Sequence, residues 1–256
     1  MITLRLMLNY LTAAAACLLG GGSLLVYTLF VFFGPVPLLN LELGPGRSLL
    51  FDAGLSLLFF AQHSGMVRSS FRQRLARLIP EEFHAALYAI ASGITLLLVV
   101  LCWQEGAALF IVQQGFLRWS LRAFFCLALL GSLWGVLSLE ALDPCGIRPL
   151  LGRVGGEKAG PISLTVKGPY RLVRHPLYLF SIVMLWSFPD LTTDRLLFNL
   201  LWTGWIVVAA FLEERDLLVV FGVSYREYQR SVPMLVPGWR SFFHQGDKEE
   251  SGGKKR

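Results

Sequence analysis

The feature that most constrains the fold is an uncharged N-terminal stretch, because no Lys, Arg, Asp or Glu occurs between Leu6 and Leu41. A transmembrane helix needs about 20 predominantly apolar residues, and this stretch is longer than the apolar region of a cleaved signal peptide. We therefore expect a retained first transmembrane helix. The composition agrees, since 55% of the 256 residues are hydrophobic and the mean hydropathy is +0.58.

Apolar segments of similar length recur along the chain, so we expect an all-α, polytopic membrane helix bundle with a single domain, residues 1–245. The expected transmembrane helices lie at about residues 8–33, 49–67, 85–104, 120–142, 176–189 and 195–212. The fifth is short, and an amphipathic cytoplasmic helix is expected after the sixth. The polar residues 246–256 are typical of a disordered tail.

Lysine and arginine are distributed as membrane topology predicts. With both termini in the cytoplasm, 19 of the 23 basic residues fall in cytoplasmic segments and four lie on the other side. This asymmetry follows the positive-inside rule. The net charge of +6 therefore indicates topology, and the lipid bilayer is the expected partner while nucleic acid is not. We expect an integral protein of a bacterial-type inner membrane.

Two smaller patterns concern packing. Gly131 and Gly135 form a GxxxG pattern in the fourth predicted helix, which predicts a close helix–helix approach. The cysteines form no CxxC pair and mostly lie in apolar runs, so neither a disulfide framework nor a metal site is expected; they are Cys17, Cys102, Cys126 and Cys145.

The most informative motif is residues 168–178, which read Gly-Pro-Tyr-Arg-Leu-Val-Arg-His-Pro-Leu-Tyr. Pro176 suits the first position of a helix, which places His175 near the N-cap. Helix N-termini attract anions, and Arg171 and Arg174 add full positive charges. The segment predicts a cradle for a carboxylate or phosphate at the cytoplasmic face. Contact of these arginines with lipid headgroups is an equal alternative.

A second motif is Glu213-Glu214-Arg215-Asp216, at the cytoplasmic end of the sixth predicted helix. Acids at a helix C-terminus are unfavourable unless a cation offsets them, and Arg171, Arg174 or a cationic ligand could do so. The segment is expected to run on as an amphipathic helix, whose spacing puts Glu214, Leu217, Phe221, Tyr225 and Tyr228 on one face. That face could close over a ligand or lie on lipid.

A third group, Gln62-His63-Ser64, lies at the cytoplasmic end of the second predicted helix. A histidine with such neighbours often serves as a hydrogen-bonded packing element. The active alternatives for His63 are a base, a group that orients a thiol, or a haem ligand.

The two C-terminal motifs resemble the signature of the isoprenylcysteine carboxyl methyltransferase and phospholipid methyltransferase superfamily, with a donor-binding part at about residues 165–237. The N-terminal half resembles the methanethiol S-methyltransferase branch of that superfamily. The residues that carry the second resemblance are Gln62-His63-Ser64, Met66, Arg68, Ile79-Pro80, Tyr88, the run from Asp143 to Arg148, the run from Leu212 to Leu217 and Val232-Pro233-Met234-Leu235.

The resemblance implies that S-adenosylmethionine is the methyl donor and a small thiol the acceptor. The donor's carboxylate would then lie at Arg171, Arg174, His175 and Pro176, and its ammonium group or ribose at Glu213 or Glu214. Tyr170, Tyr178, Tyr225 and Tyr228 would surround the adenine or face the sulfonium, since aromatic faces favour cations. His63, Arg174 and His175 are the expected catalytic residues.

Other methyl acceptors and another class of protein are the alternatives. The branch carries an Asn-His pair where this chain has Glu140-Ala141, which leaves a longer thiol, an isoprenylcysteine carboxylate or a lipid amine as alternative acceptors. The N-terminal half also resembles zeta-carotene isomerase-like membrane proteins. In that case His63 and His175 would be axial ligands of a haem. A membrane protein without catalytic activity is the remaining alternative.

Overall fold

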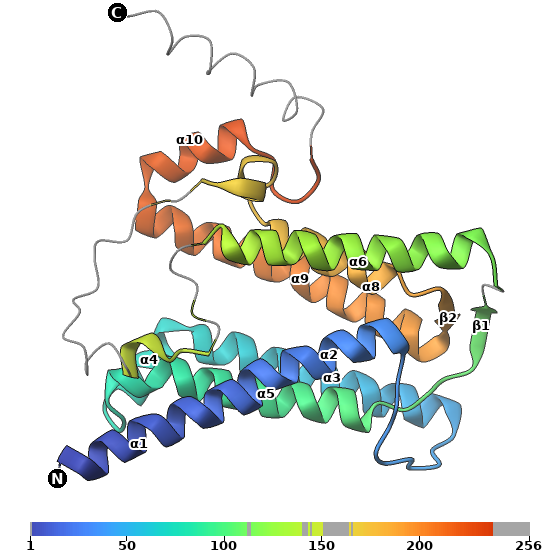
Figure 1. Ribbon diagram of the computed structural model, residues 1–256, viewed down its shortest axis with the longest axis horizontal. Helices are drawn as coiled ribbons and strands as arrows, with labels where there is room; N and C mark the ends of the chain where they lie inside the picture. The colour runs from blue at the N-terminus through green and yellow to red at the C-terminus, as the bar shows by residue number, and fades with distance from the viewer. Residues whose placement is uncertain are drawn as a thin grey trace, which may run out of the picture. The chain divides into compact units, whose positions relative to one another are not determined.

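The structure is a computed structural model that describes residues 2–111, 114–139, 143, 145–150, 164 and 166–237. Helices dominate it, which confirms the expected all-α membrane bundle (Figure 1). The elements are α1 (Ile2–Ala15), η1 (Ala16–Gly21), α2 (Gly22–Phe33), α3 (Pro45–Val67), α4 (Ser69–Leu75), η2 (Glu81–Phe83), α5 (His84–Cys102), β1 (Ala108–Ile111), α6 (Phe116–Leu137), η3 (Gly168–Arg171), α8 (Pro176–Trp186), β2 (Asp190–Thr192), α9 (Thr193–Phe221) and α10 (Val223–Ser231). The predicted tail and Glu140-Ala141 lie outside the described residues.

Within the described part of the chain, four helical stretches are long and apolar enough to cross a bilayer: Leu4–Phe33, Glu81–Cys102, Phe116–Leu137 and Thr193–Phe221. They coincide with the first, third, fourth and sixth predicted spans. The fifth, α8, is apolar but only 11 residues long, as its short sequence segment indicated. The second, α3, has 23 residues and is not among the four. The chain is an integral membrane protein.

The sixth predicted transmembrane helix, about residues 195–212, was expected to run on as an amphipathic helix, and α9 continues without a break to Phe221. A small antiparallel pairing of β1 with β2 was not expected. Next to it, Arg118 donates two hydrogen bonds of 2.9 Å to the carboxylate of Asp190. Such short strands leave too little periodic pattern to be recognised in the sequence.

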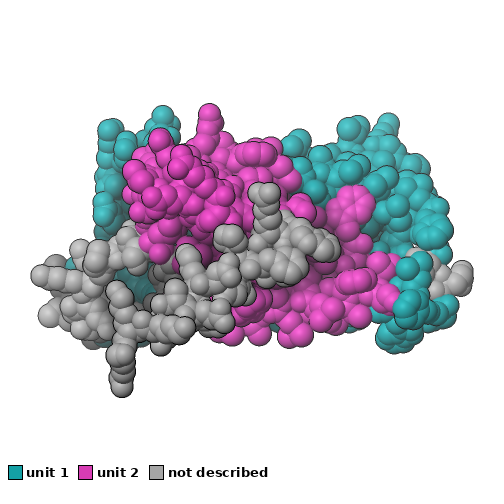
Figure 2. Space-filling view, turned by 90° about the horizontal axis from the view of Figure 1, so that it is seen from above, with its two compact units in different colours: residues 1–119, 142–160, 188–205 teal, residues 120–141, 161–187, 206–256 magenta. Residues whose placement is uncertain are grey.

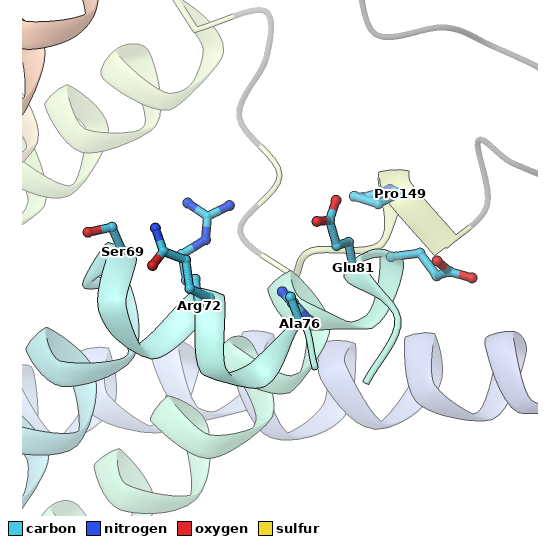
Figure 3. Close-up of a pocket in the computed structure, with 8 residues that line it drawn as sticks. Ser69, Arg72, Ala76, Glu81 and Pro149 are labelled. Carbon is cyan, nitrogen blue, oxygen red and sulfur yellow. The ribbon is translucent and has the colours of Figure 1, made fainter. Parts of the chain in front are cut away.

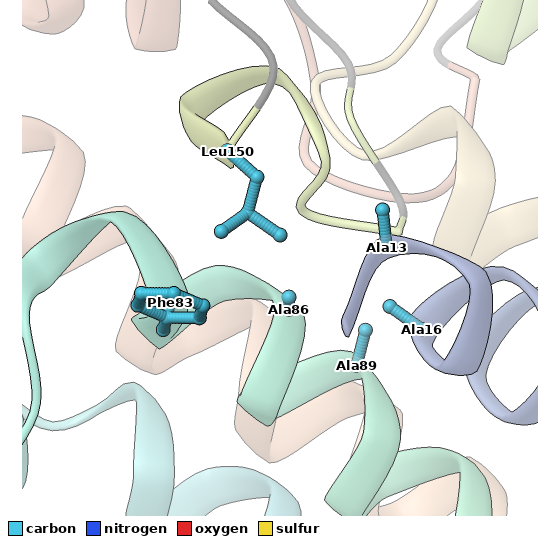
Figure 4. Close-up of a cluster of buried hydrophobic side chains, with 6 residues drawn as sticks. All are labelled: Ala13, Ala16, Phe83, Ala86, Ala89 and Leu150. Carbon is cyan, nitrogen blue, oxygen red and sulfur yellow. The ribbon is translucent and has the colours of Figure 1, made fainter. Parts of the chain in front are cut away.

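The described chain divides into two compact units, which Figure 2 shows in different colours. Unit 1 comprises residues 1–119, 142–160 and 188–205. In it α5 packs closely on η1: a Cβ added at Gly93 would lie 2.1 Å from the carbonyl oxygen of Leu19. Small side chains allow this approach, and they dominate the buried cluster of Ala13, Ala16, Phe83, Ala86, Ala89 and Leu150 (Figure 4).

Unit 2 comprises residues 120–141, 161–187 and 206–256. In it α8 lies against the glycine face of α6. A Cβ added at Gly131 would lie 2.6 Å from the ring of Phe180, and one at Gly135 would lie 2.7 Å from Leu177. The GxxxG pattern is therefore a packing feature, which confirms the prediction made from it.

The helical stripe predicted to run from Glu214 to Tyr228 is wrong in its geometry. The helix breaks at Gly222, whose φ of +55° favours glycine. Beyond it α10 turns back from the end of α9 (Figure 1). Tyr225 and Tyr228 still pack with Leu217, Leu218, Phe221 and Val232, but across a turn and not along one helix.

Candidate functional site

The backbone brings the two C-terminal motifs together in unit 2. The amide of Arg174 donates to the carbonyl oxygen of Pro233 at 2.9 Å, and that of His175 donates to Met234 at 3.1 Å. His175 precedes Pro176, which begins α8, as predicted. The segment before α8 is thus hydrogen-bonded to the segment that follows α10.

The carboxylate of Glu214 is the centre of the site. It accepts hydrogen bonds from Nε and Nη2 of Arg174 at 2.8 and 3.0 Å, and from Nε2 of His175 at 2.8 Å. The hydroxyl of Tyr225 donates at 2.8 Å, and the amide of Gln229 donates as well. Glu214 is only 7% exposed, and these donors compensate for burial of its charge.

Arg174 makes further hydrogen bonds beyond those that its Nε and Nη2 donate to Glu214. Its Nη1 donates to the carbonyl oxygens of Gln229 and Val232. Bidentate arginine–carboxylate pairs are among the stronger polar contacts, and they fix geometry. The pair therefore joins α9, α10 and the segment before α8, which means that Arg174 and Glu214 shape the site as well as line it.

A second layer of contacts surrounds His175. Its Nδ1 lies 3.6 Å from a carboxylate oxygen of Glu213, and its ring stacks on Tyr178 with centroids 5.4 Å apart. Tyr178 in turn donates to Glu213 at 2.8 Å. His175 is buried, whereas Glu213 is exposed. Both nitrogens of His175 consequently face carboxylates.

The predicted tyrosines of α10 lie on the inner side of the same site. Tyr228 donates to the carbonyl oxygen of Tyr170, and its ring makes an edge contact with Tyr225. Burial raises the pKa of Tyr225 and of Tyr228 above the ordinary range. Burial, with a contribution from Glu213, raises the pKa of Tyr170 to about 12. All three remain neutral phenols at physiological pH.

A pocket of about 440 Å³ opens at the Arg174–Glu214 pair. Charged and amide groups occupy one part of its wall, and apolar side chains form the rest; the lining residues are Arg174, Phe211, Leu212, Glu214, Arg215, Leu218, Gln229 and Met234. Pockets of this size and mixed lining suit a small amphiphilic ligand.

Most of the predicted donor-site residues are therefore brought together. Arg171 is exposed in η3, next to Tyr170. The sequence interpretation missed Gln229, although it lies four residues after Tyr225 and so on the same face of α10. It also missed Met234, whose position follows from the backbone pairing with His175.

His63 lies in unit 1, on α3. The hydroxyl of Tyr88 lies 2.8 Å from its Nε2, and Oγ of Ser92 lies 3.2 Å from its Nδ1. The rings of Phe59 and Trp205 lie 5.1 and 5.3 Å from the imidazole. The predicted polar group at this position is therefore confirmed as a hydrogen-bonded cluster, while its role stays a prediction.

Unit 1 also contains a polar pocket of about 580 Å³ beside α4, with Arg72 and Glu81 on opposite sides of it (Figure 3). The other lining residues are Ser69, Gln73, Ala76, Glu82, His84 and Pro149. None of the predicted site residues lines this pocket.

Comparison with known proteins finds methanethiol S-methyltransferases and, at lower identity, Nurim. The chain is 36% identical over 210 residues to a methanethiol S-methyltransferase of a Pseudomonas species, covering 77% of this chain and 78% of that protein. It is 33% identical over 193 residues to a methanethiol S-methyltransferase of Mycobacterium tuberculosis, covering 75% and 79%. Nurim of Bos taurus is 28% identical over 185 residues, covering 66% and 68%. No family model and no solved structure matches the chain.

Proposed function

The chain belongs to the methanethiol S-methyltransferase family, and on that premise we propose that it transfers a methyl group from S-adenosylmethionine to methanethiol, forming dimethyl sulfide. The observation that carries the proposal is the carboxylate of Glu214. Through it, Arg174 and His175 from one motif are joined to Tyr225 and Gln229 of α10, and Arg174, Glu214 and Gln229 line a pocket.

The chemistry of the lining fits this donor. S-adenosylmethionine carries a carboxylate, an ammonium group, a ribose diol, an adenine and a sulfonium. Arg171 and the N-terminus of α8 suit the carboxylate, and exposed Glu213 suits the ammonium group or the ribose. The apolar wall of Phe211, Leu218 and Met234 suits the adenine. Arg174 and Glu214, already paired, hold these groups in place.

When bound, the donor supplies a methyl group on a positively charged sulfur. The acceptor thiol must first lose its proton, because the thiolate is the nucleophile. The charges of thiolate and sulfonium cancel during transfer, so a site that excludes water favours the reaction. We assign the thiol proton to His63 and the alignment of the donor to Arg174 and His175.

The membrane setting suits the acceptor. Methanethiol is small and apolar, so it partitions into lipid and can reach a helix-lined site from within the bilayer. The distribution of Lys and Arg supports a donor site and both termini in the cytoplasm, where S-adenosylmethionine is made. An isoprenylcysteine carboxylate or a lipid amine is the alternative methyl acceptor if the test below gives no dimethyl sulfide.

The haem alternative has less support. It needs His63 and His175 as axial ligands, yet the ring nitrogens of each are in contact with protein groups of their own unit. The named relatives that match at 30% identity or more are methyltransferases.

The test measures donor binding and volatile product together. Membranes that contain the protein are given S-adenosylmethionine and methanethiol, and dimethyl sulfide is measured in the headspace. The site variant is Arg174→Ala with Glu214→Ala. The matched control is Arg226→Ala with Glu227→Ala, which removes the same two charges from the exposed side of α10.

We expect product from the parent and the control, and neither product nor donor binding from the site variant. If the parent binds the donor but forms no dimethyl sulfide from methanethiol, the donor site stands and the methyl acceptor is a different molecule. A parent that does not bind the donor would contradict the proposal altogether.

A further inference from the structure

The polar pocket of about 580 Å³ in unit 1 lies at the end of the stretch Glu81–Cys102, which is long and apolar enough to cross a bilayer. Glu81, Glu82 and His84 line the pocket and belong to the first turn of that stretch. The pocket is therefore at the level of the bilayer surface. The facing wall is formed by α4, whose lining residues are Ser69, Arg72, Gln73 and Ala76 (Figure 3).

Two of the polar side chains fix the wall that Glu81–Cys102 provides. The carboxylate of Glu82 is buried and accepts a hydrogen bond of 2.6 Å from Arg5 of α1. Nε2 of His84 lies 2.9 Å from the carbonyl oxygen of Ile79, in the turn that links α4 to η2. These contacts hold both walls in place, so the pocket is formed in advance of any ligand.

Arg72 and Glu81 carry the two charges that remain in the pocket. Among the residues that the structure describes, neither side chain forms an ion pair or a hydrogen bond with the other or with a third group. Figure 3 shows the guanidinium and the carboxylate reaching in the same direction from opposite sides of the pocket. The pocket thus presents one positive and one negative charge that are held apart.

The groups around each charge indicate what it suits. The planar guanidinium of Arg72 matches a phosphate, to which it can donate two hydrogen bonds. Ser69 and Gln73 lie on the same face of α4 as Arg72 and add a hydroxyl and an amide donor. The carboxylate of Glu81 accepts hydrogen bonds and suits an ammonium group. The pattern matches a zwitterion that carries a phosphate and a primary ammonium group.

The opposite face of α4 indicates that this zwitterion comes from the membrane. Phe71, Leu75 and Leu78 follow one another at spacings of four and three residues, which makes an apolar stripe turned away from the pocket. Phe71 and Leu78 are 39% and 83% exposed. A helical segment with such a stripe beside arginines lies in the plane of the bilayer surface. Its polar face is then among the lipid headgroups.

We propose that this pocket binds the headgroup of phosphatidylethanolamine, with the phosphate at Arg72 and the ammonium group at Glu81. The inference concerns unit 1 alone and does not depend on the methyl transfer proposed above, since the lipid is a bound component and not the methyl acceptor. Phosphatidylcholine suits the pocket less well, because its quaternary ammonium has no N–H to donate to Glu81. Phosphatidylglycerol has no cation at all.

The test compares these three lipids with identical acyl chains. Purified protein is exchanged into detergent micelles that contain equal amounts of each lipid, and the lipids that stay bound are identified by native mass spectrometry. We expect phosphatidylethanolamine to be retained about 10-fold over either other lipid, which is the effect of about one hydrogen bond to a charged group.

Two variants separate the roles of the charges. Glu81→Gln keeps the size of the side chain, and we expect it to abolish the preference for phosphatidylethanolamine over phosphatidylglycerol while Arg72 still retains both lipids. Arg72→Gln should lower the retention of all three lipids. The matched control is Arg74→Gln, which removes a charge from α4 outside the pocket lining and should retain lipids as the parent does. Equal Tm values in detergent show that the variants keep the fold.

Glycerophosphoethanolamine, the same headgroup without acyl chains, distinguishes a lipid from a soluble zwitterion. We expect no displacement of the lipid at equal concentration, and displacement would overturn the lipid as the source. Equal retention of the three lipids by the parent would overturn the headgroup site itself. An unchanged preference in Glu81→Gln, or unchanged retention in Arg72→Gln, would do the same.

Discussion

Arg174 and Glu214 lie 40 residues apart in the sequence and form a bidentate ion pair, with Nε–Oε1 at 2.8 Å and Nη2–Oε2 at 3.0 Å. Both side chains are at most 10% exposed. The pair links the two sequence motifs of the candidate site. Each buried charge is therefore stabilised by the opposite charge of its partner.

Loss of one partner of this pair should be worse for stability than loss of both. Glu214→Ala alone leaves a buried guanidinium without its carboxylate, which costs about 3–5 kcal/mol. Arg174→Ala with Glu214→Ala should recover part of the stability but none of the donor binding. Thermal unfolding in detergent and a donor-binding isotherm on the same samples measure both. A double variant less stable than either single variant would contradict this account.

Arg174→Lys should not preserve the site. Lysine carries the charge but lacks the planar fork that serves Glu214 and two backbone carbonyl oxygens at once. We expect donor affinity at least about 10-fold weaker, which corresponds to about 1.4 kcal/mol. Arg226→Lys on the exposed side of α10 is the matched control and should bind the donor as the parent does.

Gly222→Ala tests the turn that brings Tyr225 back to Glu214. The space around Gly222 is open, so a methyl group meets nothing, and the whole cost comes from its φ of +55° and ψ of −118°. Such backbone strain costs about 1–3 kcal/mol. We expect a lower Tm and weaker donor binding. Gly204→Ala, also in open space but inside α9, should leave both unchanged or raise the Tm.

Gly131→Ala should disturb the packing of α6 on α8, because the new Cβ would lie 2.6 Å from the ring of Phe180. Overpacking of this kind typically costs about 1–3 kcal/mol. Phe180→Leu in the same chain should relieve it, and the Tm of the double variant should exceed that of Gly131→Ala. Additive losses would show that the two residues do not meet.

Alkaline pH should destabilise unit 2 through Tyr170. Its folded-state pKa of about 12 lies above the value of about 10 in an unfolded chain. Below pH 10 both states are neutral and the residue has no effect on the pH dependence. Between about pH 10 and 12 only the unfolded state loses its proton, so stability falls. Tyr170→Phe should reduce that slope in a pH series of unfolding measurements, and an unchanged slope would contradict the assignment.

The apolar runs predicted most of the helices, because burial in lipid demands long uncharged segments. The GxxxG contact and the position of Pro176 at the start of α8 could also be predicted from the sequence, since each depends on local sequence. The strands were not, because three or four residues carry little pattern.

Only part of the centre of the candidate site could be predicted from the sequence. The sequence offered Arg171, Arg174 or a ligand as the cation that offsets the acidic motif, but spacing does not show that Arg174 is the one that pairs with Glu214. The break at Gly222 was hidden because Tyr225 and Tyr228 keep helical spacing from Glu214 across it. Gln229 shares a helix face with Tyr225, but its contact with Glu214 depends on the turn at Gly222.

The most direct test of the central claim follows the methyl group itself. Purified protein is given methanethiol and S-adenosylmethionine whose transferable methyl carries three deuterium atoms, and the dimethyl sulfide formed is analysed by mass spectrometry. We predict dimethyl sulfide with one fully deuterated and one unlabelled methyl group, and none from the Arg174→Ala, Glu214→Ala variant. Unlabelled dimethyl sulfide, or none from a parent that binds the donor, would contradict transfer from S-adenosylmethionine to methanethiol.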